Sequence, residues 1–115
     1  MTVSIYHNPR CSKSRQTLAL LRERDIEPEI IEYLQTPPDT ATLQRLLQLL
    51  DLNARAIIRA KEAPYSELGL GDKKLSDQAL LEAIVANPIL LERPIVVSGD
   101  LAAIGRPPEN VLGIL

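Results

Sequence analysis

The sequence predicts an α/β protein whose elements follow the order β-α-β, a central helical segment, and β-β-α. Three observations lead to this prediction. Apolar residues alternate near the N-terminus, recur at helical spacing through the middle of the chain, and give way to β-branched runs near the C-terminus. The 115 residues are sufficient for one hydrophobic core, so we expect a single domain over residues 1–115.

The first elements form a strand–helix–strand unit. Thr2–His7 alternates and stops at the turn signal Asn8-Pro9, which predicts a strand that runs into a loop. Helical spacing begins at Ser12 and ends before Pro28, and the β-branched run Glu29–Tyr33 predicts a second strand. Two strands joined through one helix of this length favour parallel pairing with a right-handed crossover.

The central segment is predicted to be helical. It opens after a Thr-Pro-Pro-Asp break, where either Asp39 or Thr40 is suited to cap a helix. The apolar stripe of this helix comprises Leu43, Leu46, Leu47 and Leu50. Two shorter helical pieces are expected at Ala54–Ala60 and Tyr65–Leu70. Ser76 is a good cap for a further helix over Asp77–Ala86, which ends at an Asn-Pro pair.

The C-terminal segment returns to strand-like residues. Ile95–Val97 is β-branched, Ser98-Gly99-Asp100 has turn chemistry, and Leu101–Ile104 is suited to pair back, which together predict a β-hairpin. Pro107 and Pro108 suit the first turn of a last helix, because proline is tolerated where backbone N–H groups have no partner in the helix.

Composition and charge exclude several classes of protein. The formal charge of −2 at pH 7 is too close to neutral to indicate nucleic acid as a partner, and no apolar run has the length of a spanning helix. We therefore expect neither nucleic-acid nor membrane binding. One cysteine allows no internal disulfide and suits a cytoplasmic location. A single histidine and a single cysteine give no basis for a metal site.

Cys11 is the candidate nucleophile because it stands where the loop after the first strand meets the first helix. Residues 1–22 contain no acid, and their basic residues are Arg10, Lys13, Arg15 and Arg22. Nearby cations and the free N–H groups of a helix start both favour thiolate over thiol. A lone cysteine is more often a small buried hydrophobe, but the polar surroundings of Cys11 favour the reactive interpretation. Ser14 is placed to donate its hydroxyl to the sulfur.

The segment around Cys11 is also suited to bind an oxyanion, because helix-start amides and basic side chains bind phosphate-like groups. One class of enzyme with such a loop is excluded. The phosphatase-type signature requires an arginine six positions after the cysteine, and that position is Thr17.

Several separated segments resemble one family. The run His7-Asn8-Pro9-Arg10-Cys11-Ser12-Lys13-Ser14-Arg15 is similar to the active-site segment of the glutaredoxin-coupled arsenate reductases, which share a superfamily with the Spx-like regulators. Further segments that match in order and spacing are Tyr33-Leu34 with Pro37-Pro38, Arg59 followed by Pro64-Tyr65 and Leu68-Gly69-Leu70, Asn87-Pro88-Ile89-Leu90, Glu92-Arg93-Pro94-Ile95-Val96-Val97, and Arg106-Pro107. The resemblance covers nearly the whole chain.

The resemblance implies a thioredoxin-like fold with the central helices as an insertion, and Pro94 as the cis-proline beside the active cysteine. It also implies a reaction: Cys11 attacks arsenate, glutathione attacks the resulting thiol-ester adduct, glutaredoxin takes over the mixed disulfide, and arsenite leaves. Arsenate, glutathione and glutaredoxin are then the partners, with glutathione as a co-substrate and no tightly bound cofactor. A chain with one cysteine fits resolution by external thiols.

The resemblance assigns Arg59, Arg93 and Arg106 to the oxygens of arsenate and of the arsenic intermediate. A single arginine is ordinarily a solvated surface charge. Three arginines at family-like positions favour a common role, because a tetrahedral oxyanion suits several forked donors that lysine cannot supply in the same geometry.

The remaining predicted site residues support the cysteine. The resemblance gives this role to His7 and Ser14, and Asn8, Arg15 and Pro94 complete the predicted site. For His7 two interpretations stay open, a structural residue at the end of a strand and a group that transfers a proton near neutral pH.

Two other functions are compatible with parts of the sequence. Ser12 and Lys13 stand where small uncharged residues are typical of arsenate reductases, which leaves open a glutathione-dependent thiol reductase of another substrate. An Spx-like regulator that binds RNA polymerase typically uses a Cys-x-x-Cys switch. Here the second position is Ser14, so a chain with one cysteine cannot form that disulfide.

Overall fold

The computed structural model describes residues 2–115, which form two compact units. The sheet unit consists of the residues up to Thr36 together with Arg93–Leu115. The helical unit is Pro37–Glu92. The division lies where the predicted elements change from strands to helices and back. A single domain over residues 1–115 stays a prediction.

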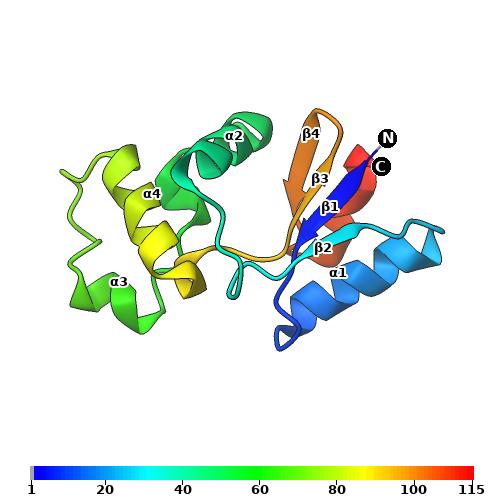
Figure 1. Cartoon of the computed structure of the whole chain (residues 1–115), viewed down its shortest axis with the longest axis horizontal. Coiled ribbons are helices and arrows are strands. Elements are labelled where there is room, and N and C mark those ends of the chain that lie inside the picture. The colour runs from blue at the N-terminus through cyan, green and yellow to red at the C-terminus, as the bar shows by residue number, and fades with distance from the viewer. Residues whose placement is uncertain (1) are drawn as a thin grey trace. The chain divides into compact units, whose positions relative to one another are not determined.

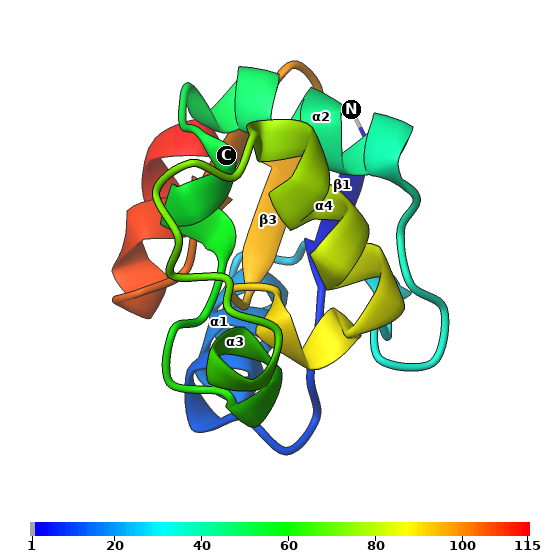
Figure 2. The same ribbon diagram turned by 90° about the vertical axis from the view of Figure 1, so that its left-hand side faces the viewer.

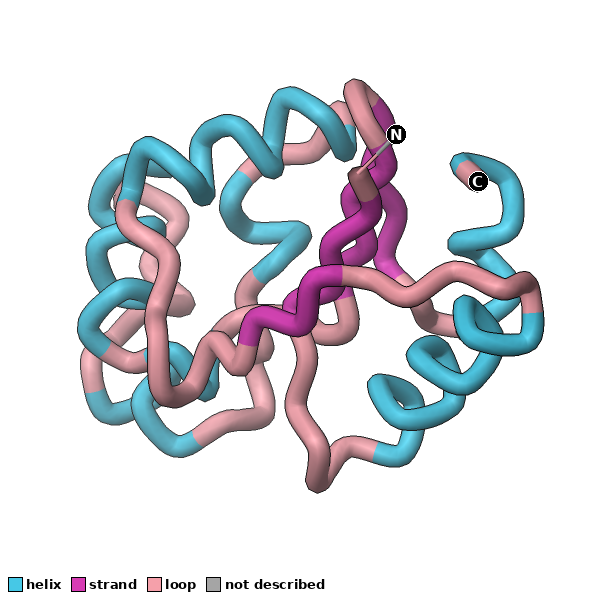
Figure 3. The backbone as a smooth tube through the Cα atoms, turned by 45° about the vertical axis from the view of Figure 1, so that its right-hand side comes forward, coloured by secondary structure: helices cyan, strands magenta, loops and turns pink. Residues whose placement is uncertain are grey.

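Four strands form the sheet of the sheet unit (Figure 3). They are β1 (Val3–Tyr6), β2 (Glu29–Ile31), β3 (Ile95–Ser98) and β4 (Leu101–Ile104), in the spatial order β2-β1-β3-β4. β1 and β2 are parallel, as predicted for a strand–helix–strand unit, whereas β3 is antiparallel to both β1 and β4. The predicted C-terminal hairpin is therefore confirmed.

Two helices complete the sheet unit, the α-helix α1 (Ser12–Glu23) and the 3₁₀ helix η3 (Pro108–Ile114) (Figure 1). They contact each other and share one apolar core with the sheet. The buried members of this core are Ile5, Leu18, Leu21, Val96 and Val111. Aliphatic side chains thus fix α1 against β1, and the loop between these two elements carries Cys11.

Gly105 allows the end of β4 to approach α1 closely. Its N–H donates to the carbonyl oxygen of Pro94 at 2.9 Å. A Cβ atom at this position would lie 2.6 Å from Oγ1 of Thr17 and 2.8 Å from Cγ of Pro94, so a side chain would force its neighbours to shift. The residue that follows this close contact is Arg106.

The helical unit consists of α2 (Thr40–Leu50), η1 (Ala54–Ile57), α3 (Ala63–Glu67), α4 (Asp77–Ala86) and η2 (Pro88–Leu90), with η1 and η2 being 3₁₀ helices. α2 packs beside α4 (Figure 2). Their buried leucine and isoleucine side chains are Leu43, Leu46, Leu47, Leu80, Leu81 and Ile84. Asp39 caps α2 by accepting from the N–H of Thr42, which decides between the two predicted caps.

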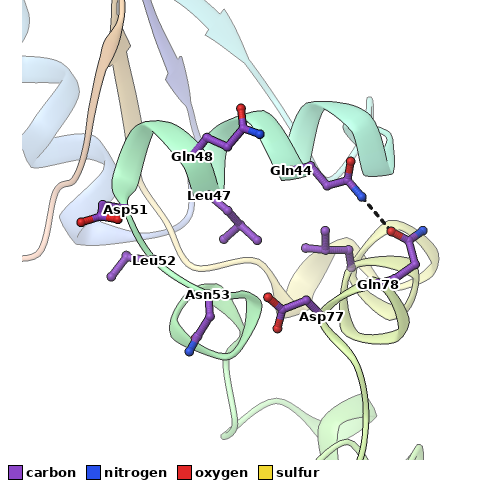
Figure 4. A pocket seen from close by; sticks show the side chains of 9 residues that line it. Gln44, Leu47, Gln48, Asp51, Leu52, Asn53, Asp77 and Gln78 are labelled. Carbon is purple, nitrogen blue, oxygen red and sulfur yellow. Dashed lines mark hydrogen bonds between the residues drawn. The ribbon is translucent and has the colours of Figure 1, made fainter.

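An open groove of about 550 Å³ lies between α2 and α4 (Figure 4). Leu47 and Leu81 line it together with exposed amide and carboxylate groups, and Nε2 of Gln44 donates to Oε1 of Gln78 at 2.8 Å across it. None of the predicted site residues lines this groove. Its volume therefore does not locate the chemistry that the sequence predicts.

The order of the predicted elements is confirmed, and the differences concern bounds, helix type and one added element. The piece expected at Tyr65–Leu70 is α3 at Ala63–Glu67, and the 3₁₀ helix η2 was not predicted. The pieces expected at Ala54–Ala60 and after Pro107 are 3₁₀ helices, in which N–H groups bond three residues back, as Asn110 does to Pro107 at 3.0 Å. Apolar spacing predicts a helix but does not distinguish these short forms. Within residues 2–115, no helix combines the length and the apolar character that a membrane crossing requires.

Candidate active site around Cys11

Cys11 occupies the position directly before α1, as the sequence predicts. Its backbone is extended, with φ −91° and ψ 123°, and its N–H donates to the carbonyl oxygen of Asn8 at 3.0 Å, which closes the loop after β1. The residue is partly exposed. A sulfur atom at this place faces N–H groups that have no partner within the helix.

The surroundings of Cys11 lower the pKa of its thiol. Burial acts in the opposite direction and raises this pKa, because it disfavours the charged form. The backbone N–H of Ser14, the side chain of Arg93 and the backbone N–H of Lys13 are directed at the sulfur and favour the thiolate, as does the charge of Arg106. Together these groups outweigh burial, so Cys11 ionises more readily than an ordinary cysteine.

Two of the predicted arginines converge on the sulfur. Nη2 of Arg106 lies 3.4 Å from Sγ of Cys11, and Nε of Arg106 donates to the carbonyl oxygen of Arg93 at 2.7 Å. The side chain of Arg93 also forms a hydrogen bond with Cys11, and its Nε and Nη1 are shielded from solvent. Two guanidinium groups beside a thiolate are suited to bind an oxyanion that approaches the sulfur.

His7, Asn8 and Ser14 form a buried hydrogen-bonded group beneath the loop. Nδ1 of His7 lies 2.6 Å from Oγ of Ser14, and the backbone N–H of Asn8 donates to the same oxygen at 3.0 Å. Ser14 is fully buried, and His7 is 6% exposed. The serine hydroxyl therefore joins the start of α1 to the end of β1.

The role of the Ser14 hydroxyl differs from the prediction. It was expected to donate to the sulfur, but it is engaged with His7 and Asn8, and the backbone N–H of Ser14 faces the sulfur instead. The reason is geometric: the helix start directs its N–H groups toward the position before it, where Cys11 lies. Ser14 therefore acts on the sulfur as predicted, but through its backbone N–H and not through its hydroxyl.

The surroundings of His7 lower the pKa of its imidazole. Burial lowers the pKa of His7, the charge of Glu32 raises it, and the charges of Arg22 and Arg15 lower it again, with a net decrease. Nδ1 of His7 and Oγ of Ser14 share one hydrogen bond, and the same oxygen also accepts from the N–H of Asn8. This arrangement favours the structural interpretation of His7 over proton transfer near neutral pH.

Further hydrogen bonds hold the loop together. Nη1 of Arg15 donates to the carbonyl oxygen of Pro9 at 2.9 Å, and Oδ1 of Asn8 accepts from the N–H of Arg10 at 3.0 Å. Arg15 thus stabilises the loop, whereas the cations that act on the pKa of Cys11 are Arg93 and Arg106. Clustering of positive charge in residues 1–22 identified the right loop but not the right arginines.

Pro94 is buried and follows a cis peptide bond, as the family resemblance implies. A second cis bond, between Arg106 and Pro107, was not predicted. Both arginines that contact Cys11 therefore directly precede a cis-proline.

Arg59, the third predicted arginine, belongs to the helical unit and pairs with two carboxylates. Nε of Arg59 lies 3.3 Å from Oε1 of Glu62, and its Nη1 lies 3.1 Å from Oε1 of Glu92. Sequence reasoning missed both acids. Glu62 follows Arg59 by three residues and was a readable signal, whereas Glu92 is 33 residues away and is brought there by the fold.

Among residues 2–115, no three His, Cys, Asp or Glu side chains are grouped as a metal site requires.

The chain is similar to known proteins over nearly its whole length. The family model described as "ArsC family" matches residues 6–114. An uncharacterized protein of Escherichia coli strain K12, YfgD, is 59% identical over 98% of this chain and 96% of its own length. An arsenate reductase of Neisseria meningitidis is 50% identical over 98% of this chain and 97% of its own length. The solved structure of an arsenate reductase from Vibrio cholerae superimposes with a TM-score of 0.97 at 57% identity, covering 100% of this chain and 98% of that one. The thioredoxin-like fold expected from the sequence is thereby confirmed, and the chain belongs to the ArsC family.

Proposed function

We propose that this protein is an arsenate reductase that uses Cys11 as its nucleophile and external thiols as its reductants. The observation that carries the proposal is the position of the Cys11 sulfur, at the start of α1 and 3.4 Å from Nη2 of Arg106. A thiolate in that place faces an anion-binding set of amides and guanidinium groups. The names of relatives about half identical to this chain support arsenate as the anion.

In the first step the Cys11 thiolate attacks arsenic, and one arsenate oxygen takes up two protons and leaves as water. The product is a thiol-ester adduct in which arsenic is still As(V). In this proposal Arg93 and Arg106 hold the remaining oxygens, and their contacts with the sulfur that forms the new bond support that role. Arg59 is the third arginine that the family resemblance assigns to these oxygens.

In the second step glutathione attacks the sulfur of Cys11. A disulfide forms between the two sulfurs, and the electron pair of the sulfur–arsenic bond passes to arsenic, which becomes As(III) and leaves as arsenite. Glutaredoxin then takes the glutathione from the mixed disulfide and returns Cys11 to its thiol form. The chain supplies one cysteine, so both reducing thiols must come from other molecules.

The test is arsenate-dependent oxidation of NADPH in the presence of glutathione, glutathione reductase and glutaredoxin. We expect turnover that requires all three components. It should disappear in Cys11→Ser, because a serine hydroxyl stays protonated at neutral pH and is a poor nucleophile. Mass spectrometry of the enzyme trapped without glutaredoxin should find glutathione on Cys11.

A wild-type protein that reduces no arsenate in this assay would overturn the proposal. Should the same protein reduce a small disulfide with glutathione while ignoring arsenate, the glutathione-dependent thiol reductase would take its place. Thioredoxin with thioredoxin reductase, offered instead of glutaredoxin, tests the reductant separately from the substrate.

A further inference from the structure

The guanidinium group of Arg59 is bound by carboxylates on two sides. Its Nε lies 3.3 Å from Oε1 of Glu62 and its Nη1 lies 3.1 Å from Oε1 of Glu92. The three side chains are only 21%, 22% and 24% exposed, so solvent screens these pairs less than it screens pairs on an open surface. An oxyanion therefore meets an arginine whose charge is already balanced.

The backbone places both acids. The N–H of Arg59 donates to the carbonyl oxygen of Leu90 at 2.7 Å, and the N–H of Glu92 donates to that of Ile57 at 2.8 Å. These bonds flank an antiparallel bridge between Ile58 and Leu91. The N–H of Glu62 in turn donates to the carbonyl oxygen of Arg59 at 3.3 Å. Both carboxylates are thus fixed near Arg59 by the chain that carries them.

The pairing pattern occupies both binding edges of the guanidinium. An arginine presents two edges on which a pair of N–H groups points in parallel, Nε with Nη2 and Nη1 with Nη2. Glu62 is on Nε and Glu92 is on Nη1, so each edge has one of its two positions taken. An oxyanion that binds Arg59 through two hydrogen bonds must displace one carboxylate.

We propose that Glu62 and Glu92 are specificity-determining residues that compete with the oxyanion for Arg59. This inference rests on the proposed function, in which Arg59 holds arsenic oxygens. A tethered carboxylate has the advantage of a high effective concentration, so a free monoanion of equal charge does not displace it. A dianion such as arsenate gains more from the guanidinium and does. The two acids thereby make Arg59 selective for dianions and weaken its binding of all anions.

Glu62→Gln and Glu92→Gln test the competition because the amide keeps the shape of the side chain and loses its charge. We expect each variant to lower the KM for arsenate by about three- to tenfold, which is the size of effect typical for loss of a partly buried ion pair. The change in kcat should be smaller. Glu67→Gln is the matched control. It removes one negative charge from the same unit at an exposed position, and its KM should stay at the wild-type value.

The Arg59→Gln background separates pairing from the general field of the protein. If Glu92 acts through Arg59, Glu92→Gln should leave the KM of Arg59→Gln unchanged. An equal decrease in that background, a decrease in Glu67→Gln, or an unchanged or raised KM in both Glu62→Gln and Glu92→Gln would overturn the inference.

A binding measurement keeps the inference distinct from the proposed function. The Nε–H signal of Arg59 in a nitrogen–proton correlation spectrum, identified by its loss in Arg59→Gln, should move on titration with arsenate in the absence of glutathione. Nitrate, a monoanion, should leave it in place, and Glu62→Gln should shift the arsenate midpoint to lower concentration. No arsenate turnover together with these shifts would contradict only the reaction. Normal turnover with an Arg59 signal that ignores arsenate would contradict only the competition.

Discussion

The starts of α1 and α4 contrast the two units of the molecule. α4 begins after Ser76, whose Oγ accepts from the N–H of Ala79 at 3.1 Å, so the helix start is closed by an ordinary cap. α1 begins after Cys11, whose side chain forms no such close cap bond, although the N–H groups of Lys13 and Ser14 are directed at its sulfur. One helix start is satisfied by its own side chain, and the other is left to interact with an anion.

The chemistry of the side chain before a helix decides whether the helix start is reactive. A neutral hydroxyl that accepts from the helix stabilises the fold and is chemically inert. A sulfur at the same position gains from the same N–H groups mainly in its charged form, and Arg93 and Arg106 add to that gain.

The largest effect on activity is expected from the two arginines that contact Cys11. Replacing Arg93 or Arg106 with Ala removes a charge-assisted hydrogen bond to the reacting group, and we expect about a tenfold to hundredfold loss of kcat/KM for arsenate. The pKa of Cys11 should rise in both variants, measured by thiolate absorbance against pH. Replacement by Lys should recover part of the lost efficiency, because lysine keeps the positive charge but lacks the paired N–H donors of the guanidinium group. A kcat/KM for arsenate that stays at the wild-type value in both Ala variants would show that neither arginine acts in the reaction.

Ser14→Ala should separate stability from thiolate formation. The variant leaves the buried N–H of Asn8 and Nδ1 of His7 without the serine oxygen, and we expect a loss of about 1–3 kcal/mol in the free energy of unfolding, measured by urea denaturation. The backbone N–H of residue 14 persists, so the pKa of Cys11 should stay depressed. Ser66→Ala, at an exposed serine of α3, is the control and should unfold like the wild type. A pKa of Cys11 that returns to the ordinary value would instead assign the effect to the hydroxyl.

Ser76→Ala tests the other helix start. Loss of the cap of α4 should lower the free energy of unfolding by about 1 kcal/mol, a typical value for an N-cap serine. The pKa of Cys11 should not change, because Ser76 is absent from the groups that act on it. A shifted thiolate titration in this variant would show that the two helix starts are coupled, contrary to the comparison above.

The smallest effect concerns pH. The pKa of His7 is lowered in the folded protein, so the unfolded chain binds a proton that the folded chain does not. Stability is therefore complete above the unfolded pKa of about 6.5 and decreases as pH falls below it. Unfolding free energies between pH 8 and pH 5 should fall more steeply in the wild type than in His7→Gln. Parallel curves would mean that the pKa of His7 is the same in the folded and unfolded states.

The fold could be predicted from sequence wherever local signals determine it. The helix over Asp77–Ala86 and its cap Ser76 were predicted with the correct bounds, because capping and apolar spacing are properties of adjacent residues. The 3₁₀ form of Pro108–Ile114 was not predicted, because the same proline and apolar signals fit either helix type.

The site was predictable only in part, for the same reason. Helix-start chemistry indicated Cys11 from its neighbours in the chain, and the family resemblance supplied Arg93 and Arg106. The approach of Glu92 to Arg59 depends on a bridge between segments more than 30 residues apart, and no local pattern encodes it. The contact of the Ser14 hydroxyl with His7, seven residues away, depends likewise on the fold.

Amide groups at the start of α1 belong to the backbone, so the part of the sulfur's activation that comes from Lys13 and Ser14 is independent of the side chains at those positions. Mutation can exchange the arginines one by one, whereas the amides persist as long as the helix begins at this residue. A substitution at Arg93 or Arg106 therefore removes only part of the support for the thiolate, and the part that comes from the backbone is beyond the reach of any single side-chain change that leaves the helix start in place.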